Sequence, residues 1–375
     1  MSEAPAPTFA WQARLRRWRW ALFPLGLWLF TRLSYFLLGY LSLKLTPGYR
    51  PDAVPPLHRY PALDAFCSWD CGWYHRLARE GFREAWYANF WPGLPFLARY
   101  LAKLLGTSAA MSVLIIANSA CLGGYLVIYR IFLRLDGQAA ARAGLILFAA
   151  YPFAYYHAAG YPETIMIFSS ALAVFLAMAG RHAPAGLVLG LGVMCRHLTM
   201  LLGGGLLAAQ LRQRGVRRFF KSPSFLALGL PFVIVGIYAT WCYVHFGDAL
   251  AFVHGRYSWG KTAWWNIVDV LRNYKKRPHI VSFIPFTLFP AIGTVMLLRA
   301  RKYAELAAAA LPLTALLWVI GAFALGRYSA SCWPAFLPLG QWYERHPRWQ
   351  IPILLCFGLA QGWYFFLHSH HYEIQ

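Results

Sequence analysis

Charged residues are scarce in this sequence, and acidic residues are the scarcest. Only 13% of the 375 residues are charged, and only 13 are Asp or Glu. A soluble domain carries about a quarter charged residues, so the composition argues against a soluble protein. The period-2 alternation of apolar and polar residues that a membrane β-barrel needs is also missing. A helical membrane protein is the class that remains.

Motifs of metal and nucleotide chemistry are absent as well. There is no DxD, no HExxH, no CxxC with metal-ligand spacing and no Gly-rich nucleotide loop. We therefore expect no metal site and no cofactor. If the protein transfers an activated group, that group must arrive on a lipid.

Cysteine and histidine give no site either. The seven cysteines are an odd, scattered number and indicate no disulfide framework. Cys67 and Cys71 are interpreted as buried thiols or a chance placement rather than a disulfide or metal site. The 12 histidines are dispersed, and the run HSHH at 368–371 is interpreted as a solvated tail.

Long apolar runs dominate what is present. Hydrophobic residues make up 59% of the chain, and the mean hydropathy is +0.45. Runs of roughly 15–25 apolar residues recur along the chain, near the length that crosses a bilayer as a helix. The sequence therefore predicts an all-α polytopic membrane protein, with residues 1–375 forming one domain.

The net charge of +22 comes largely from short basic segments beside these runs, such as RLRRWRW at 14–20 and LRQRGVRRFFK at 211–221. This is the positive-inside pattern of cytoplasmic loops, and it argues against nucleic-acid binding.

The same pattern places the N-terminus inside and the C-terminus outside, with external loops at about 44–90 and 245–279. About ten or eleven transmembrane or re-entrant helices are expected. Full spans are predicted near 21–43, 111–133, 142–158, 164–180, 224–244, 281–299, 304–325, 329–343 and 350–367, with 91–107 lying in the outer interface.

Only roughly 28 residues separate the cytoplasmic segments AGRHAP and QLRQRGVRR. Two full spans of about 20 residues each do not fit there, and one span would put the two basic segments on opposite sides. A re-entrant hairpin of two short helices satisfies both constraints. Arg196 and His197 would lie at its tip.

The stretch FCSWDCGWYHRLAREGF at 66–82 sets an acid among aromatic residues. A helical wheel at about 100° per residue places Asp70 inside the apolar arc of an amphipathic helix on the external face. We expect Ser68 to cap this helix. Two interpretations of Asp70 are open. It is either a first-turn acid paired with an arginine, or a general base in a dry aromatic pocket.

Two other external acids lie close to apolar runs or in aromatic-rich turns. They are Glu163, in GYPET, and Asp248, in HFGDALAF. Stabilisation of a helix N-terminus is the simpler interpretation for each.

Five segments follow one another in order over residues 65–340. The first is SWDCGWYHRLAREGF followed by NFWPGLPFLARYLAKLLG. The others are FAAYPFAYYHAAGYPETIMIFSSALA, VMCRHLTMLL, YVHFGDALAFVHGRYSWGK and GRYSASCWPAFLPL. Together they resemble the PIG-V family of GT-C glycosyltransferases, and the first resembles the family's first external loop. WPGLP and CRHLT depart from the family pattern.

The resemblance implies an inverting enzyme that moves a sugar, typically mannose, from a polyprenyl-phosphate donor to a hydroxyl of a lipid-linked or glycan acceptor. It maps the general base onto Asp70. The donor phosphate needs cations, for which the candidates are Arg196, Arg256, Lys261 and Arg327, with interfacial snorkelling as the alternative for each. The expected substrate pocket comprises Trp69, Trp73, Tyr74, Glu163, His197 and Asp248.

A transporter or lipid flippase is the alternative function, because it too would use re-entrant helices and intramembrane charge. A structural partner in a larger complex is a third. The absence of an Asn-x-Ser/Thr sequon favours a bacterial inner membrane with a periplasmic site over an endoplasmic reticulum membrane with a lumenal site. The expected partners are the polyprenyl-phosphate donor, the acceptor and membrane lipids.

Overall fold

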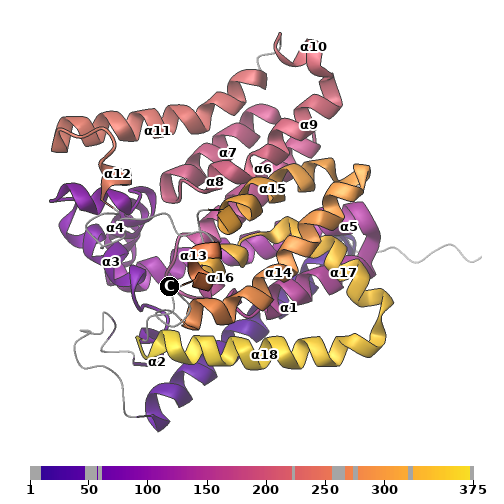
Figure 1. The fold of residues 1–375 in the computed structure, drawn as a ribbon, viewed down its shortest axis with the longest axis horizontal. Coiled ribbons are helices and arrows are strands. Elements are labelled where there is room, and N and C mark those ends of the chain that lie inside the picture. Colours follow the sequence, from indigo (N-terminus) through magenta and orange to yellow (C-terminus); the bar gives the residue numbers. More distant parts are fainter. Residues whose placement is uncertain are drawn as a thin grey trace, which may run out of the picture.

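The computed structural model describes residues 10–46, 57, 61–221, 224–255, 267–272, 278–319 and 324–371. Over these residues the chain is helical and has no strand, as predicted. The helices enclose a hydrophobic core that draws residues from Tyr35 to Phe365 (Figure 1).

Five helices are long and apolar enough to cross a bilayer, so the chain is an integral membrane protein. They are α1 (Ala10–Leu45), α5 (Ala109–Ala150), α11 (Ser224–Phe246), α14 (Pro278–Arg299) and α18 (Pro347–Ser369). The helices of intermediate length are α3 (Asp70–Glu80), α4 (Gly93–Leu105), α6 (Glu163–Met178), α7 (His182–Cys195), α9 (Gly204–Arg214), α15 (Ala304–Val319) and α17 (Phe336–Arg345). The short ones are α2 (Pro61–Asp64), α8 (Thr199–Leu202), α10 (Val216–Phe219), α12 (Ala251–His254), α13 (Ile267–Arg272) and α16 (Leu325–Ser329), with 3-10 turns η1 (Ala85–Asn89), η2 (Ala154–His157), η4 (Arg301–Tyr303) and η6 (Trp333–Ala335).

The predicted spans at 111–133 and 142–158 are the two arms of α5. They meet at Gly137, whose φ of 78° breaks the helix, and Phe132 packs against Gly144 across the turn. The second arm ends at Ala150, before the predicted boundary. The reason is Pro152, which disfavours helical backbone at Tyr151 (φ −53°, ψ 137°).

The predicted hairpin between AGRHAP and QLRQRGVRR is formed by α7 and α9, joined through α8. The Gln213 amide at the end of α9 donates to the Ala177 carbonyl, 2.9 Å away, so the chain returns to the level at which α7 begins. α7 has 14 residues, which is about 21 Å of helix and less than the hydrocarbon thickness of about 30 Å. Arg196 and His197 lie at the turn between the arms.

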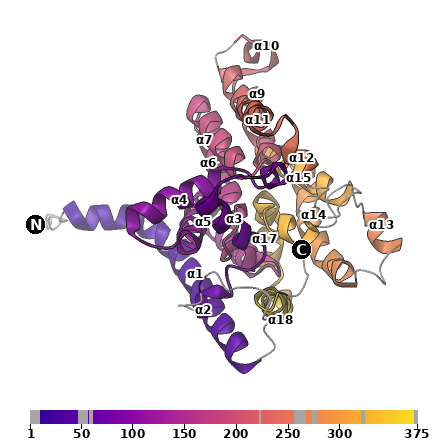
Figure 2. The same ribbon diagram turned by 90° about the vertical axis from the view of Figure 1, so that its left-hand side faces the viewer.

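The two ends of the bundle differ in composition. At one end, basic segments are tied together by Lys302 on Asp136 (2.5 Å) and by Arg212 on Glu305 (3.2 Å). α3, α4 and α12 gather at the opposite end, far from α10 (Figure 1), and Figure 2 looks onto that end. The site described next lies at the start of α3.

Candidate active site

α3 begins at Asp70, later than predicted, because Trp69 leaves the helical conformation. Trp69 has φ 57° and ψ −117°, a region that bulky residues rarely adopt. The predicted Ser68 cap is wrong, since no side chain among the described residues caps α3. Instead, the Tyr161 hydroxyl donates to the Ser68 carbonyl at 3.2 Å and accepts from the Asp70 amide at 3.4 Å.

Cys67 and Cys71 form a disulfide across this turn, so the expectation of two free thiols is wrong. Both residues are buried. The expectation assumed one continuous helix over 66–82. The turn at Trp69 instead lets the two side chains join across a Cα separation of 4.9 Å, within the range that disulfides span.

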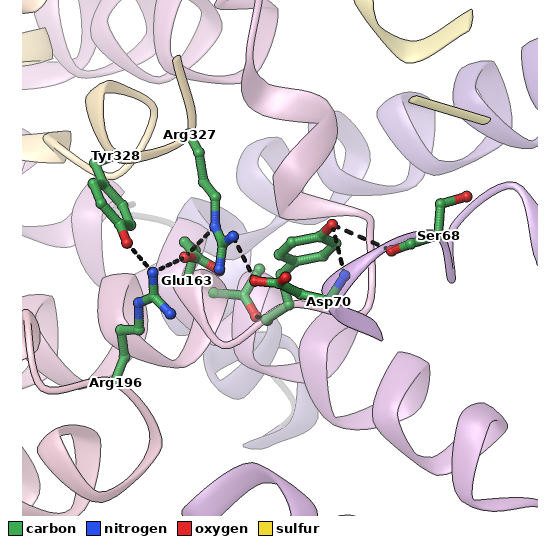
Figure 3. A network of polar contacts seen from close by, with 8 residues as sticks. Ser68, Asp70, Glu163, Arg196, Arg327 and Tyr328 are labelled. Carbon is green, nitrogen blue, oxygen red and sulfur yellow. Dashed lines mark hydrogen bonds and ion pairs between the residues drawn. The ribbon is translucent and has the colours of Figure 1, made fainter. Parts of the chain in front are cut away.

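Four charged side chains meet beside the turn, and we call them the charge cluster: Asp70, Glu163, Arg196 and Arg327 (Figure 3). Arg327 bridges the two acids, with Nη1 at 2.6 Å from Asp70 Oδ2 and Nε at 2.6 Å from Glu163 Oε1. Arg196 Nη2 lies 3.4 Å from the same Glu163 oxygen and donates to the Tyr328 hydroxyl. All four were singled out in the sequence, and the fold brings them into contact.

Helix ends account for this placement. Asp70 and Glu163 are the first residues of α3 and α6, where the positive end of the helix dipole favours an acid. Arg196 directly follows the last residue of α7, where the negative end favours a cation. The helix-terminus interpretation of Glu163 therefore agrees with its position, and the residue has two arginine partners in addition.

Burial distinguishes the members of the charge cluster. The exposed fraction of the side chain is 0% for Glu163, 5% for Arg327, 9% for Arg196 and 20% for Asp70. Glu163 is thus an internal counter-ion for both arginines, whereas Asp70 is the member most accessible to a ligand.

Several buried polar atoms at the charge cluster have no hydrogen-bond partner among the described residues. They are Glu163 Oε2, Arg196 Nε, Arg327 Nη2 and Tyr74 Oη. Buried polar atoms in native proteins are normally satisfied. These atoms therefore indicate where water or a polar ligand completes the network.

The Tyr74 hydroxyl is buried and interacts electrostatically with the charge cluster. The Tyr74 ring meets Phe90 edge-on at 5.3 Å. Burial raises the pKa of Tyr74, which Arg196 opposes, so its hydroxyl stays protonated and can donate a hydrogen bond.

The end of α18 closes over the same turn, so the interpretation of HSHH as a solvated tail is wrong. His368 is fully buried, and its ring lies 5.3 Å from Tyr155 and 5.8 Å from Tyr161. The His371 ring lies 5.9 Å from Trp69, the residue that turns the chain into α3. These contacts could not be predicted from the sequence because they join segments 207 to 302 positions apart.

The other residues expected in the pocket make different contacts. Trp73 packs on Trp86 at 5.1 Å, and His197 packs on Trp91 at 5.6 Å. Asp248 accepts from the Leu250 amide at 2.9 Å, which agrees with a local capping role, and its bond with His254 lowers the pKa of its carboxyl. Arg256 and Lys261 lie outside the described residues.

Sequence reasoning missed two tyrosines that hold the arginines. Arg327 lies over the Tyr161 ring at 4.6 Å, and Arg196 lies over the Tyr328 ring at 5.0 Å. Their positions carried a signal, because Tyr161 stands two residues before Glu163 and Tyr328 directly follows Arg327.

The charge cluster combines a carboxylate that can take up a proton with two guanidinium groups that can bind an anion. Arg327 belongs to both groups of side chains, because its guanidinium can bind an anion and is at present paired with the Asp70 carboxylate. A carboxylate is a stronger base without a guanidinium against it, and Arg327 Nη1 lies 2.6 Å from Asp70 Oδ2.

No protein-family model matches this sequence, and no curated protein sequence matches it significantly. The chain is similar to a solved oligosaccharyltransferase of Archaeoglobus fulgidus tethered with an acceptor peptide, with 13% identity and a TM-score of 0.42. The match covers 92% of this chain and 55% of the archaeal chain, so this chain spans about half the length of that protein.

Proposed function

We propose that this protein is a GT-C glycosyltransferase similar to the PIG-V mannosyltransferases. It would transfer a sugar, typically mannose, from a polyprenyl-phosphate donor to a hydroxyl of a lipid-linked or glycan acceptor. The observation that carries the proposal is the Asp70–Arg327 contact of 2.6 Å, which joins the most accessible acid of the charge cluster to a buried arginine.

In the proposed reaction, the acceptor oxygen attacks the anomeric carbon as Asp70 takes the hydroxyl proton. The bond from that carbon to the phosphate oxygen breaks on the opposite face, and its electron pair stays on the phosphate. The anomeric configuration is therefore inverted. Arg196 and Arg327 stabilise the charge that develops on the departing polyprenyl phosphate.

Donor binding and base activation are coupled in this scheme through Arg327. Two acids and two arginines balance in the charge cluster as it stands. An incoming phosphate adds negative charge and competes with Asp70 for Arg327. The carboxylate is then released to accept a proton only when the donor is present.

The position of Asp70 fits an external site. The basic segments lie at the opposite end of the bundle from α3 (Figure 1), and positively charged loops favour the cytoplasm. The Cys67–Cys71 disulfide fits an oxidising compartment. We propose the periplasmic face of a bacterial inner membrane, with the lumenal face of the endoplasmic reticulum as the alternative.

The remaining predicted residues keep their proposed roles. Trp69 and Tyr74 border the charge cluster and are proposed to line the sugar site. Trp73, His197 and Asp248 stay candidates for the wall of the substrate pocket, and Arg256 and Lys261 for the donor phosphate.

A lipid transporter is the second candidate, because the short arms of α7 and α9 and the buried arginines also suit transport. Purified protein given polyprenyl-phosphate mannose and a membrane lipid extract as acceptor separates the two. Release of polyprenyl phosphate with formation of a mannosylated product supports the transferase. Movement of the donor across a proteoliposome membrane without release supports the transporter and contradicts our proposal.

A further inference from the structure

The Cys67–Cys71 disulfide closes a ring of five residues that contains Asp70, and we call residues 67–71 the disulfide ring. Its middle residue, Trp69, is one of two described non-glycine residues with positive φ, the other being His371. Such a conformation is unfavourable for a bulky residue and persists only where the surroundings enforce it. The backbone conformation that orients Asp70 is therefore imposed by the surrounding residues and is not a local preference of the chain.

The disulfide ring is tied to the segment that leads into α6. The Tyr161 hydroxyl bridges the Ser68 carbonyl and the Asp70 amide, on either side of Trp69. The Gly160 amide donates to the Phe66 carbonyl at 2.9 Å, directly before the ring. Glu163 follows two residues after Tyr161, so both acids that hold Arg327 belong to segments joined here.

The disulfide sulfur itself forms part of this joint. A Cβ added to Gly160 would lie 2.4 Å from Cys71 Sγ, which shows that Cys71 rests directly on the Gly160 backbone. The disulfide ring and the 160–163 segment therefore fit together without spare room, and a shift of the sulfur would displace either Asp70 or Glu163.

We propose that Cys67 and Cys71 are positioning residues whose disulfide aims the Asp70 carboxylate at Arg327 and at the acceptor hydroxyl. The activity part of this inference rests on the proposed function. Reduction adds two electrons and two protons to the disulfide and releases two thiols, while a dithiol reductant becomes its own disulfide. Without the bond, Trp69 can relax to an ordinary φ and turn Asp70 away.

The first test compares Cys67→Ser/Cys71→Ser with Cys356→Ser, which changes an exposed free cysteine on α18. We expect kcat to fall by about 10–100-fold in the double variant, as for a reacting group misplaced by about 1 Å, with donor KM within about twofold. Cys356→Ser should match the wild type. A wild-type kcat in the folded double variant overturns the proposal.

A second pair of variants keeps all cysteines. Gly160→Ala pushes on Cys71 Sγ, whereas Gly72→Ala on α3 meets nothing within 4 Å. We expect Gly160→Ala to lower kcat as Cys67→Ser/Cys71→Ser does, and Gly72→Ala to leave it unchanged. Equal kcat values for the two variants would contradict the role of the disulfide ring.

A readout without turnover separates this inference from the proposed function. Hydrogen–deuterium exchange is measured on protein whose thiols have been counted by maleimide mass labelling, before and after reduction with dithiothreitol. We expect faster exchange of backbone amides at 69–73 and 160–164 in the reduced protein and in Cys67→Ser/Cys71→Ser. Unchanged exchange in both segments, or seven free thiols before reduction in place of the expected five, overturns the inference even if transferase activity is found. A missing activity with the expected exchange counts against the proposed function alone.

Discussion

Arg327 contacts both acids of the charge cluster, and its side chain is only 5% exposed. Replacing it with alanine leaves Glu163 and Asp70 with less positive charge in a buried site. Breaking a buried ion pair from one side costs about 3–5 kcal/mol. We expect Arg327→Ala to lower the free energy of unfolding by this order, measured by denaturant titration in detergent.

Arg76→Ala is the matched control for that prediction. Arg76 pairs with Glu80 on the surface of α3, with side chains 49% and 33% exposed, and exposed pairs contribute only about 0–1 kcal/mol. An equal loss of stability in the two variants would mean that the charge cluster does not hold the segments together.

At the scale of single residues, the sequence predicted the charged residues of the site better than the tyrosines and the disulfide that hold them in place. Asp70 and Glu163 stood out as acids close to apolar or aromatic-rich segments, and Arg196 and Arg327 stood out as cations for the donor phosphate that the resemblance implies. Tyr161, Tyr328 and the disulfide did not stand out. Their roles depend on a left-handed turn at Trp69 and on contacts between distant segments, neither of which a helical wheel contains.

At the scale of elements, α7 depends on close backbone packing against α11. A Cβ on Gly186 of α7 would lie 2.2 Å from the Ala227 carbonyl oxygen of α11. Overpacking of this kind costs about 1–3 kcal/mol and would displace the helix that ends at Arg196. We expect Gly186→Ala to lower the midpoint of thermal unfolding in detergent.

Gly236→Ala is the control, because Gly236 lies on α11, the partner helix of α7, and nothing lies within 4 Å of its added Cβ. Alanine is the better helix former by up to about 1 kcal/mol, so this variant should equal or exceed the wild type. A Gly186→Ala variant as stable as Gly236→Ala would contradict the packing described for α7 and α11.

Element boundaries were predictable where the chain carries a strong local signal. The hairpin of α7 and α9 followed from chain length and charge parity, and α6 begins and ends close to its predicted limits. The second arm of α5 was expected to reach residue 158 because its apolar run continues. Hydropathy does not register that Pro152 stops the helix at Ala150.

At the scale of the whole molecule, the separation of charge predicts the orientation in the membrane. Arg83 is exposed beside α3, and Arg217 is exposed on α10 at the basic end. Single cysteines at these positions, in a Cys356→Ser background, can be labelled in intact cells with a membrane-impermeant maleimide. We expect Arg83→Cys to react and Arg217→Cys to react only after the membrane is permeabilised.

The reverse labelling pattern would place the charge cluster in the cytoplasm and contradict the proposed use of an externally facing donor. The class of the molecule followed from composition alone, since an apolar, acid-poor chain of this kind must be helical in a bilayer. The individual membrane spans were predicted less well than the class. Five described helices have the length and hydropathy of a full span, and glycine and proline divide other apolar runs into shorter arms.

The most direct test of Asp70 as the general base is the turnover of Asp70→Asn with polyprenyl-phosphate mannose. Asparagine keeps the shape of the side chain and can still accept a hydrogen bond from Arg327, but it cannot take the acceptor proton. With Glu80→Gln, an exposed acid on the same helix, as the control, we expect kcat to fall by about 10²–10⁴ in Asp70→Asn only. Turnover of Asp70→Asn close to that of Glu80→Gln would contradict the assignment of Asp70 as the base.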